Sequence, residues 1–305
     1  NNCVKARLWP ERHNNVTNNY PVILLTYRNN KGLEDYWTYT TLSAGTAGTA
    51  YINDYTGNLV FVHEDVSTTG NLLPVTIQHV YNGYMMNKKF AGSYPSAGRG
   101  WKLSVQQTLL TSDKYGLTGE SLEDFPYAYE DGDGTVHFFY KIVEEDGTVK
   151  YLDEDGLGLE LTFSGSDKLI TDEDDNVMTF GAKGNLTSIT DASGNTIQVK
   201  YTTTDDGTNR ITRVIDGAGH TVTLAEHNTN THNIKSITDP VGRVTSFAFS
   251  VYNETSGNKS VTQITYPDGT KSRYSYDSDG ALVTATSADG SGLRFTYTSK
   301  EKGKR

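Results

Sequence analysis

The sequence has 305 residues, enough for one large domain or two ordinary ones, with about 75% of the unfolded surface buried on folding. Its 27 Lys and Arg against 37 Asp and Glu give a net charge of −10, and basic residues cluster only at Lys300–Arg305, which argues against a nucleic-acid partner. The single cysteine, Cys3, excludes a disulfide framework, and the longest aliphatic run, Val22–Leu25, is too short to span a bilayer.

Short strands with period-2 patterns are predicted along the whole chain. The first is Pro21–Tyr27. In Pro74–Tyr81, alternate residues from Val75 to Tyr81 share one face. Val136–Val143 and Thr148–Leu152, separated by an Asp-Gly turn, form the clearest predicted hairpin. Because 30 Gly and 20 Tyr accompany abundant Thr, Asn and Asp, the composition predicts an all-β protein with many tight turns.

From about residue 185 the sequence repeats a unit of strand, turn, strand and polar link. Asp-x-x-Gly turns stand at 191–194, 216–219 and 239–242, a looser Pro-Asp-Gly turn follows at 267–269, and Gly290 marks a fifth copy. The spacings of the marker glycines are therefore 25, 23, 27 and 21 residues. A lone hairpin is marginal in water, so the units are expected to stack into one curved or spiralling antiparallel sheet. The turn positions predicted to carry this structure are Asp191, Gly194, Asp216, Gly219, Asp239, Gly242, Asp268, Gly269, Tyr276, Asp277 and Gly280.

These units resemble those of the RHS-repeat, or YD-repeat, proteins. Tyr276-Asp277-Ser278-Asp279-Gly280-Ala281-Leu282 carries the Tyr-Asp-x-x-Gly-x-Leu pattern that names the family. Upstream, Gly57–Val60, Leu73–Val75 and Gly98–Trp101 resemble the segment that precedes the repeats in large Gram-positive members. The resemblance implies a spiralling β-sheet shell that holds or displays a C-terminal effector, often a toxin. Asp239–Gly242 also resembles the family's self-cleaving junction, but its register among the repeats favours an ordinary turn.

The resemblance also implies a division of the chain into three regions. Residues 1–50 would be the end of a preceding β-module, of the DNRLRE-type surface kind, with a linker at Gly32–Ala50. Residues 51–184 would be the RHS N-terminal β-segment, and residues 185–305 the YD-type repeats. The absence of an apolar leader and the strand-like pattern close to residue 297 predict that the chain is a segment of a longer polypeptide.

Catalytic and metal-binding motifs are weak in this sequence. The acidic stretch Asp172–Asn176 lacks the Gly and Glu that a calcium loop requires, which favours a solvated turn. The seven histidines show no metal-ligand spacing, and His63 has no evident partner near it in the sequence. No Gly-x-Ser-x-Gly elbow occurs. We therefore expect no catalytic residue, no metal site and no cofactor.

Two other functions stay open beside the structural one. Aromatic residues such as Trp37, Tyr55, Tyr94 and Trp101 could stack on sugars, although tyrosine is also a common strand residue. Paired carboxylates of a hydrolase are visible only in a fold. We expect a non-enzymatic shell segment of a secreted or wall-associated bacterial RHS protein. Its partners would be the remainder of the same polypeptide, with a cell-surface glycan as a second candidate, and no membrane span or nucleic acid.

Overall fold

A computed structural model describes residues 5–9, 22–26, 32–87, 96–203, 207, 209–227, 232–253 and 258–298. Strands account for most of the regular structure, as the sequence predicts. Within these residues there is a single α-helix, the short α1 (Glu120–Asp124), with 3-10 turns at Gly45–Ala47, Gly83–Asn87 and Ser112–Tyr115. The protein is therefore nearly all β.

Two smaller sheets are formed by the first seven strands. The strands β1 (Lys5–Trp9) and β2 (Val22–Thr26) pair antiparallel, so a strand is confirmed in the region 21–27. A five-stranded antiparallel sheet then follows in chain order, with β3 at Tyr39–Ser43, β4 at Thr49–Asn53, β5 at Leu59–Ser67, β6 at Thr76–Asn82 and β7 at Trp101–Leu103. The predicted linker therefore contains strands, because residues 39–43 pair with 49–53.

Alternation along β6 places its apolar and aromatic side chains as predicted. Ile77, His79 and Tyr81 are fully buried on one face; on the other face Thr76 is exposed, while Val80 and Asn82 are buried as well. The face with His79 and Tyr81 contacts the long sheet, because the His79 and Phe247 rings lie 4.5 Å apart and Tyr81 Oη accepts the Leu282 amide.

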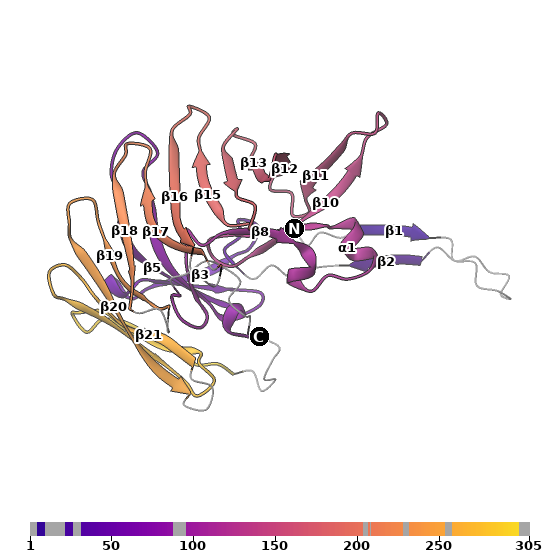
Figure 1. The fold of residues 1–305 in the computed structure, drawn as a ribbon. Helices are drawn as coiled ribbons and strands as arrows, with labels where there is room; N and C mark the ends of the chain where they lie inside the picture. Colours follow the sequence, from indigo (N-terminus) through magenta and orange to yellow (C-terminus); the bar gives the residue numbers. More distant parts are fainter. Residues whose placement is uncertain are drawn as a thin grey trace.

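The remaining strands form one long antiparallel sheet in which each strand from β8 to β24 pairs with the next (Figure 1). Their bounds are Thr108–Thr111, Tyr127–Glu130, Val136–Val143, Val149–Asp153, Glu160–Ser164, Asp167–Thr171, Val177–Phe180, Leu186–Thr190, Thr196–Thr203, Asn209–Ile215, Thr221–Glu226, Ile234–Thr238, Val244–Asn253, Asn258–Thr265, Lys271–Tyr276, Leu282–Thr286 and Gly292–Arg294. The hairpin predicted at 136–152 is confirmed as β10 and β11. The curved sheet of successive hairpins is the predicted fold class.

The long sheet turns back on itself where β8 meets the turn before β15. The Leu109 amide donates to the carbonyl of Gly184 at 2.8 Å, and the Leu186 amide donates to the carbonyl of Gln107 at 3.1 Å. Thr108 and Asn185 form an antiparallel bridge between these bonds. The start of the repeats is therefore fastened to the strands that precede them.

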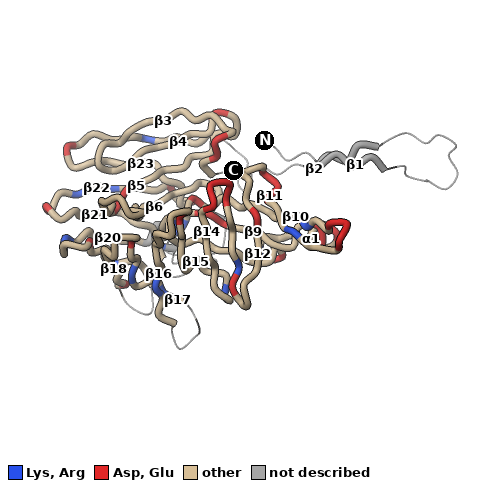
Figure 2. Tube along the Cα trace, turned by 90° about the horizontal axis from the view of Figure 1, so that it is seen from above, with Lys and Arg blue, Asp and Glu red and all other residues tan. Residues whose placement is uncertain are grey.

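On one face of the long sheet, buried side chains recur at the same position of each unit, and their spacing along the sequence is that of the marker glycines. The position that opens each unit holds an aliphatic residue that is at most 2% exposed, namely Leu186, Ile211, Ile234, Val261 and Leu282. We call this face, which also carries Val199, Leu224, Phe247 and Tyr274, the inner face. Acidic residues lie in several of the turns at the strand ends (Figure 2).

Candidate functional site

The repeated turns share one hydrogen-bond pattern. In the first copy the Gly194 amide donates to the carbonyl of Asp191 at 2.9 Å, and Oδ1 of Asp191 accepts the amides of Ser193 and Asn195. Gly194 has φ of 86°, in the left-handed region that glycine adopts without strain. The hydrogen bond from the Asn195 side chain holds the pKa of Asp191 below its usual value. The aspartate thus accepts the backbone amides of the turn, and the glycine three residues later adopts its left-handed backbone conformation.

Asp216, Asp239 and Asp277 take the place of Asp191 in three further turns, and Gly219, Gly242 and Gly280 the place of Gly194. In the looser copy the first turn position is Tyr266, whose carbonyl accepts the Gly269 amide at 2.9 Å. Asp268 therefore stands two residues later than the other aspartates and accepts the amide and hydroxyl of Thr270. Pro267 sits at the second turn position, where its fixed φ suits the turn.

The tyrosines that end the second strand of a unit bind back to the start of the same unit. Tyr201 donates to the carbonyl of Leu186 at 2.6 Å, and Tyr297 donates to the carbonyl of Leu282 at 2.8 Å. Tyr276 makes the equivalent bond to Val261 and accepts a hydrogen bond from Trp101 Nε1. Burial raises the pKa of Tyr276 well above its ordinary value, so the phenol stays protonated and donates.

The five-stranded sheet covers the inner face of the later units. The ring of Phe61 on β5 meets Tyr274 and Phe295 edge-on, with centroids 6.1 and 6.2 Å apart. Tyr274 donates to the carbonyl of Ala47 at 2.7 Å, and Tyr81 Oη accepts the Leu282 amide at 3.2 Å. In this region of the described chain, the inner face is therefore filled by strands of the same polypeptide.

A buried polar network lies in that contact. Asp65 accepts from His63 Nδ1 at 2.9 Å and from His79 Nδ1 at 2.5 Å, and His63 Nε2 lies 2.8 Å from Tyr266 Oη. Burial alone would raise the pKa of Asp65, but His79 and the hydrogen bonds from both imidazoles outweigh it and hold that pKa below its usual value. His63 and Asp65 are two residues apart on β5, and His79 lies opposite His63 on β6. The three side chains therefore share one face of the sheet.

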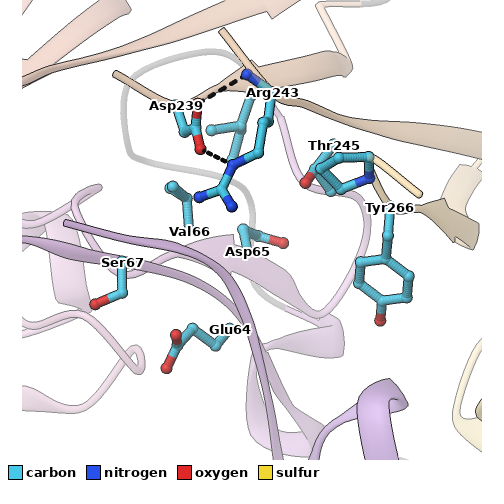
Figure 3. Close-up of a pocket in the computed structure, with 10 residues that line it drawn as sticks. Glu64, Asp65, Val66, Ser67, Asp239, Arg243, Thr245 and Tyr266 are labelled. Atoms are coloured by element: carbon cyan, nitrogen blue, oxygen red, sulfur yellow. Dashed lines mark hydrogen bonds and ion pairs between the residues drawn. The ribbon is translucent and has the colours of Figure 1, made fainter. Parts of the chain in front are cut away.

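A cavity of about 320 Å³ opens beside this network, between β5 and the third repeat unit (Figure 3). Glu64 and Asp65 line one side, and Asp239 with Arg243 lines the other. Arg243 Nε lies 2.6 Å from Asp239 Oδ2, so that carboxylate is already paired. The carboxylates at this cavity are therefore largely committed to structural contacts.

The predicted sugar-stacking residues fall in different surroundings. Trp37 and Tyr55 stack with centroids 5.5 Å apart and an interplanar angle of 13°, and Tyr55 is 78% exposed. Trp101 is 2% exposed and packs against Phe61 and Tyr274, so its ring has no face open to a ligand. Tyr94, like Cys3, lies outside the described residues.

Sequence reasoning missed the buried histidines. His63, His79 and His137 are each at most 2% exposed and each lies next to an aspartate. The available signal was the period of the strand, since His63 and Asp65 are two residues apart on β5 and so point the same way. The partners of His137 come from separate segments, and no spacing in the sequence reveals them.

Comparison with known proteins supports the resemblance seen in the sequence. The family model described as RHS Repeat matches residues 257–291, which include β22 and β23 with the Tyr276–Gly280 turn. A search of curated proteins finds no match. Two solved structures are similar to this chain, namely a crystal structure of TcdB2-TccC3-Cdc42 and one of TcdB2-TccC3-TEV.

The similarity to these two structures covers most of this chain and little of theirs. The first is 13% identical with a TM-score of 0.28, over 78% of this chain and 12% of that chain. The second is 14% identical with a TM-score of 0.27, over 80% of this chain and 13% of that chain. The chain thus spans about an eighth of their length. Among the described residues, no helix has the length and apolar character needed to cross a membrane.

Proposed function

We propose that this chain, an RHS/YD-repeat protein, is a scaffold segment of a larger secreted or surface-associated polypeptide whose sheet encloses or displays a C-terminal effector. The role is structural, and the remainder of the same polypeptide is its partner. Secretion, attachment to a cell wall and the effector itself all belong to the proposal. The proposal also includes the division of the chain into three regions at residues 50 and 184, and the structural role of the turn positions.

The observation that carries this proposal is the repetition of the inner face. Leu186 and its four counterparts occupy the same buried place in five successive units. Each unit adds two strands to one continuous sheet, so further units of the same kind would extend its curved wall. Such construction yields an enclosing surface whose chemistry does not depend on any single side chain.

The carboxylates at the cavity beside β5 support this function over a hydrolase. A retaining or inverting glycosidase needs two acids that are free to reach one bond. Asp65 is instead bound by two imidazoles, and Asp239 by Arg243 and two backbone amides. Asp65 thus serves the packing of β5 against the repeats, and Asp239 serves its own repeat turn.

A glycan-binding role remains a second candidate because of one observation. The ring of Tyr55 is 78% exposed and is supported from behind by Trp37, an arrangement that could present a flat face to a sugar. Glycan-array binding that is lost in Tyr55→Ala but kept in Tyr84→Ala, an exposed tyrosine elsewhere, would favour this candidate.

The test of the scaffold proposal is cryo-electron microscopy of the natural polypeptide that contains these residues. The expected result is a sheet that continues beyond β24 in further hairpins and surrounds or carries the downstream segment. A polypeptide in which the sheet ends near residue 298 and the downstream segment folds apart from it would overturn the proposal. Paired limited proteolysis checks the same point, because an enclosed segment resists cleavage until the sheet unfolds.

A further inference from the structure

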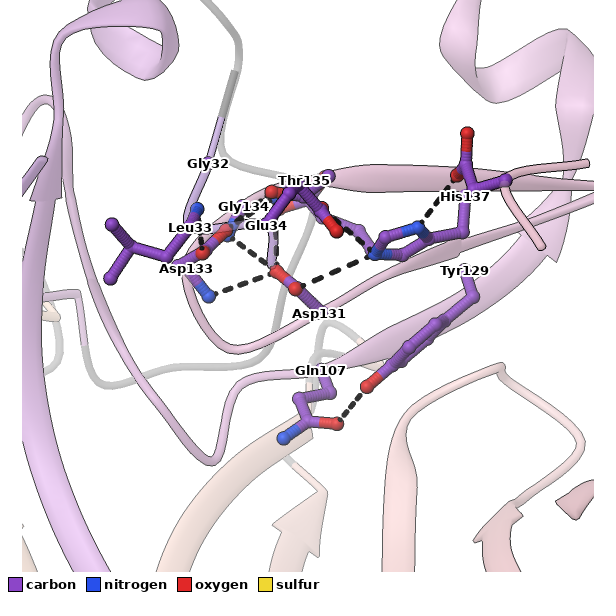
Figure 4. A network of polar contacts seen from close by, with 12 residues as sticks. Gly32, Leu33, Glu34, Gln107, Tyr129, Asp131, Asp133, Gly134, Thr135 and His137 are labelled. Carbon is purple, nitrogen blue, oxygen red and sulfur yellow. Dashed lines mark hydrogen bonds and ion pairs between the residues drawn. The ribbon is translucent and has the colours of Figure 1, made fainter. Parts of the chain in front are cut away.

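A compact cluster of ligand-type atoms lies where the segment before β3 meets the turn between β9 and β10 (Figure 4). It consists of Glu34 Oε1, Asp131 Oδ2 and His137 Nε2, which all lie within 4.8 Å of one another. His137 Nε2 is 3.6 Å from the Glu34 oxygen and 3.5 Å from the Asp131 oxygen. Glu34 comes from the segment before β3, whereas Asp131 and His137 both belong to the β9–β10 hairpin, so the fold brings two distant segments together here.

The histidine is held so that Nε2 faces the two carboxylates. Its Nδ1 lies 2.9 Å from Asp155 Oδ2, and its ring stacks on Tyr129 with centroids 5.7 Å apart. A neutral imidazole that donates from Nδ1 to a carboxylate carries its lone pair on Nε2, so His137 can bind a metal ion there once the ion displaces the Nε2 proton. Asp155 thus has the geometry of the carboxylate that supports a ligating histidine.

Each of the two carboxylates keeps one oxygen atom that accepts no hydrogen bond from the backbone. Oδ1 of Asp131 accepts the amides of Asp133, Gly134 and Thr135, which leaves Oδ2 directed at the histidine. Glu34 is 6% exposed, and its Oε1 is buried and accepts no hydrogen bond. A buried carboxylate oxygen without a hydrogen bond is costly unless a cation lies against it.

Acidic side chains outnumber basic ones in the cluster. Glu34, Asp131 and Asp155 surround the single imidazole, and Asp133 adds a fourth carboxylate next to Leu33 and Thr135. The nearby Lys102 ammonium is paired with Glu130 and with the carbonyl of Asp131. A divalent cation bound by Glu34 and Asp131 would offset the repulsion between their carboxylates.

We propose that Glu34, Asp131 and His137 bind a divalent transition-metal ion of the zinc type. A tetrahedral site with metal–ligand bonds of about 2.1 Å separates its ligand atoms by about 3.4 Å, close to the two distances at His137 Nε2. One imidazole with two carboxylates suits zinc or a neighbouring metal and not calcium, which takes oxygen ligands. The ion would tie the segment before β3 to the β9–β10 hairpin and so join the two sheets.

The test is calorimetric titration of the chelator-treated chain with Zn²⁺, with Ca²⁺ as the comparison ion. One Zn²⁺ per chain is expected, with no competition from equimolar Ca²⁺. Glu34→Gln and His137→Gln should each weaken binding about tenfold or more, and Asp155→Asn about tenfold through the orientation of His137. His220→Gln is the matched control, because His220 also binds an aspartate through Nδ1 but lies in an exposed repeat turn.

A second measurement does not depend on the folding of any variant. Crystals of the unaltered chain soaked with Zn²⁺ should give an anomalous scattering peak between Glu34, Asp131 and His137. A peak elsewhere, no titratable binding, or unchanged affinity in folded Glu34→Gln and His137→Gln would overturn the proposal. The folded state of each variant is checked by its far-ultraviolet circular dichroism.

Discussion

The hydroxyl of Tyr276 donates a hydrogen bond of 2.5 Å to the carbonyl oxygen of Val261, fifteen residues earlier. Tyr201 and Tyr297 make the same bond over the same separation, to Leu186 and Leu282. A tyrosine near the end of a unit's second strand, which in Tyr276 is also the tyrosine of the Tyr-Asp-x-x-Gly pattern, therefore fastens that strand to the beginning of the unit's first strand. The corresponding places in the other two units hold Glu226 and Phe249, which lack a phenol.

Removal of one such hydroxyl should weaken the fold without a change in shape. In Tyr201→Phe the carbonyl of Leu186 loses its phenol donor while the ring stays in place, so the free energy of unfolding should fall by about 1 kcal/mol. Urea denaturation monitored by fluorescence measures the change. Tyr55→Phe is the control: Tyr55 is exposed, so we expect a loss below about 0.5 kcal/mol. Equal losses in the two variants would contradict a role for the repeated bond.

The left-handed turn glycines should be sensitive to any side chain for backbone reasons alone. Gly219 has φ of 87°, and a Cβ there would meet nothing within 4 Å, so the cost of Gly219→Ala is conformational and about 1 kcal/mol. Gly219→Asn should cost less, because asparagine tolerates this region. Gly181→Ala is the control, since its nearest neighbour is the Thr187 methyl at 3.4 Å and its φ is ordinary. The melting temperatures of the three variants should therefore rank Gly181→Ala above Gly219→Asn above Gly219→Ala.

The repeat architecture could be predicted from the sequence because its causes are local. The Asp191 and Gly194 positions follow from the demands of one turn, and the alternation along each strand follows from the pleat. Their recurrence at 25, 23, 27 and 21 residues then fixes a stack of hairpins. Even the looser turn at Tyr266–Gly269 is predictable, although its aspartate stands two positions later than in the other copies.

Contacts between the two sheets could not be predicted in the same way. Phe61 and Tyr274 are more than two hundred residues apart, and nothing in either strand specifies the other as its neighbour. The same holds for Glu34, Asp131 and His137, whose spacing matches no metal motif. The resemblance implies a linker at residues 32–50, yet residues 39–43 pair with 49–53 as the first two strands of the five-stranded sheet. Long-range packing decides these features.

The packing of the five-stranded sheet on the repeats should contribute much of the stability. Phe61 is fully buried between Trp101, Tyr274 and Phe295. Phe61→Ala should therefore lower the free energy of unfolding by about 3–5 kcal/mol. Phe163→Ala, at a ring that is 47% exposed, should cost about 1 kcal/mol. If thermal unfolding gave similar values for both variants, the two sheets would not form one cooperative core.

Asp65 should make the stability of the same contact depend on pH. Its folded pKa lies below the ordinary value of 3.8 because His79 and the bonds from both histidines outweigh its burial. The unfolded chain then binds the proton more readily, so the stabilisation is complete above pH 3.8 and is lost as the pH falls through the folded pKa.

Asp65→Asn removes the charge and leaves two buried imidazoles without it, so at pH 7 the free energy of unfolding should fall by about 3 kcal/mol. Below the folded pKa the variant and the parent should converge, because the parent carboxylate is then protonated as well. Denaturation between pH 2 and pH 7 measures both curves, with Asp174→Asn, at an exposed turn, as the control. A constant difference across this range would show that Asp65 acts through its shape and hydrogen bonds, not through its charge.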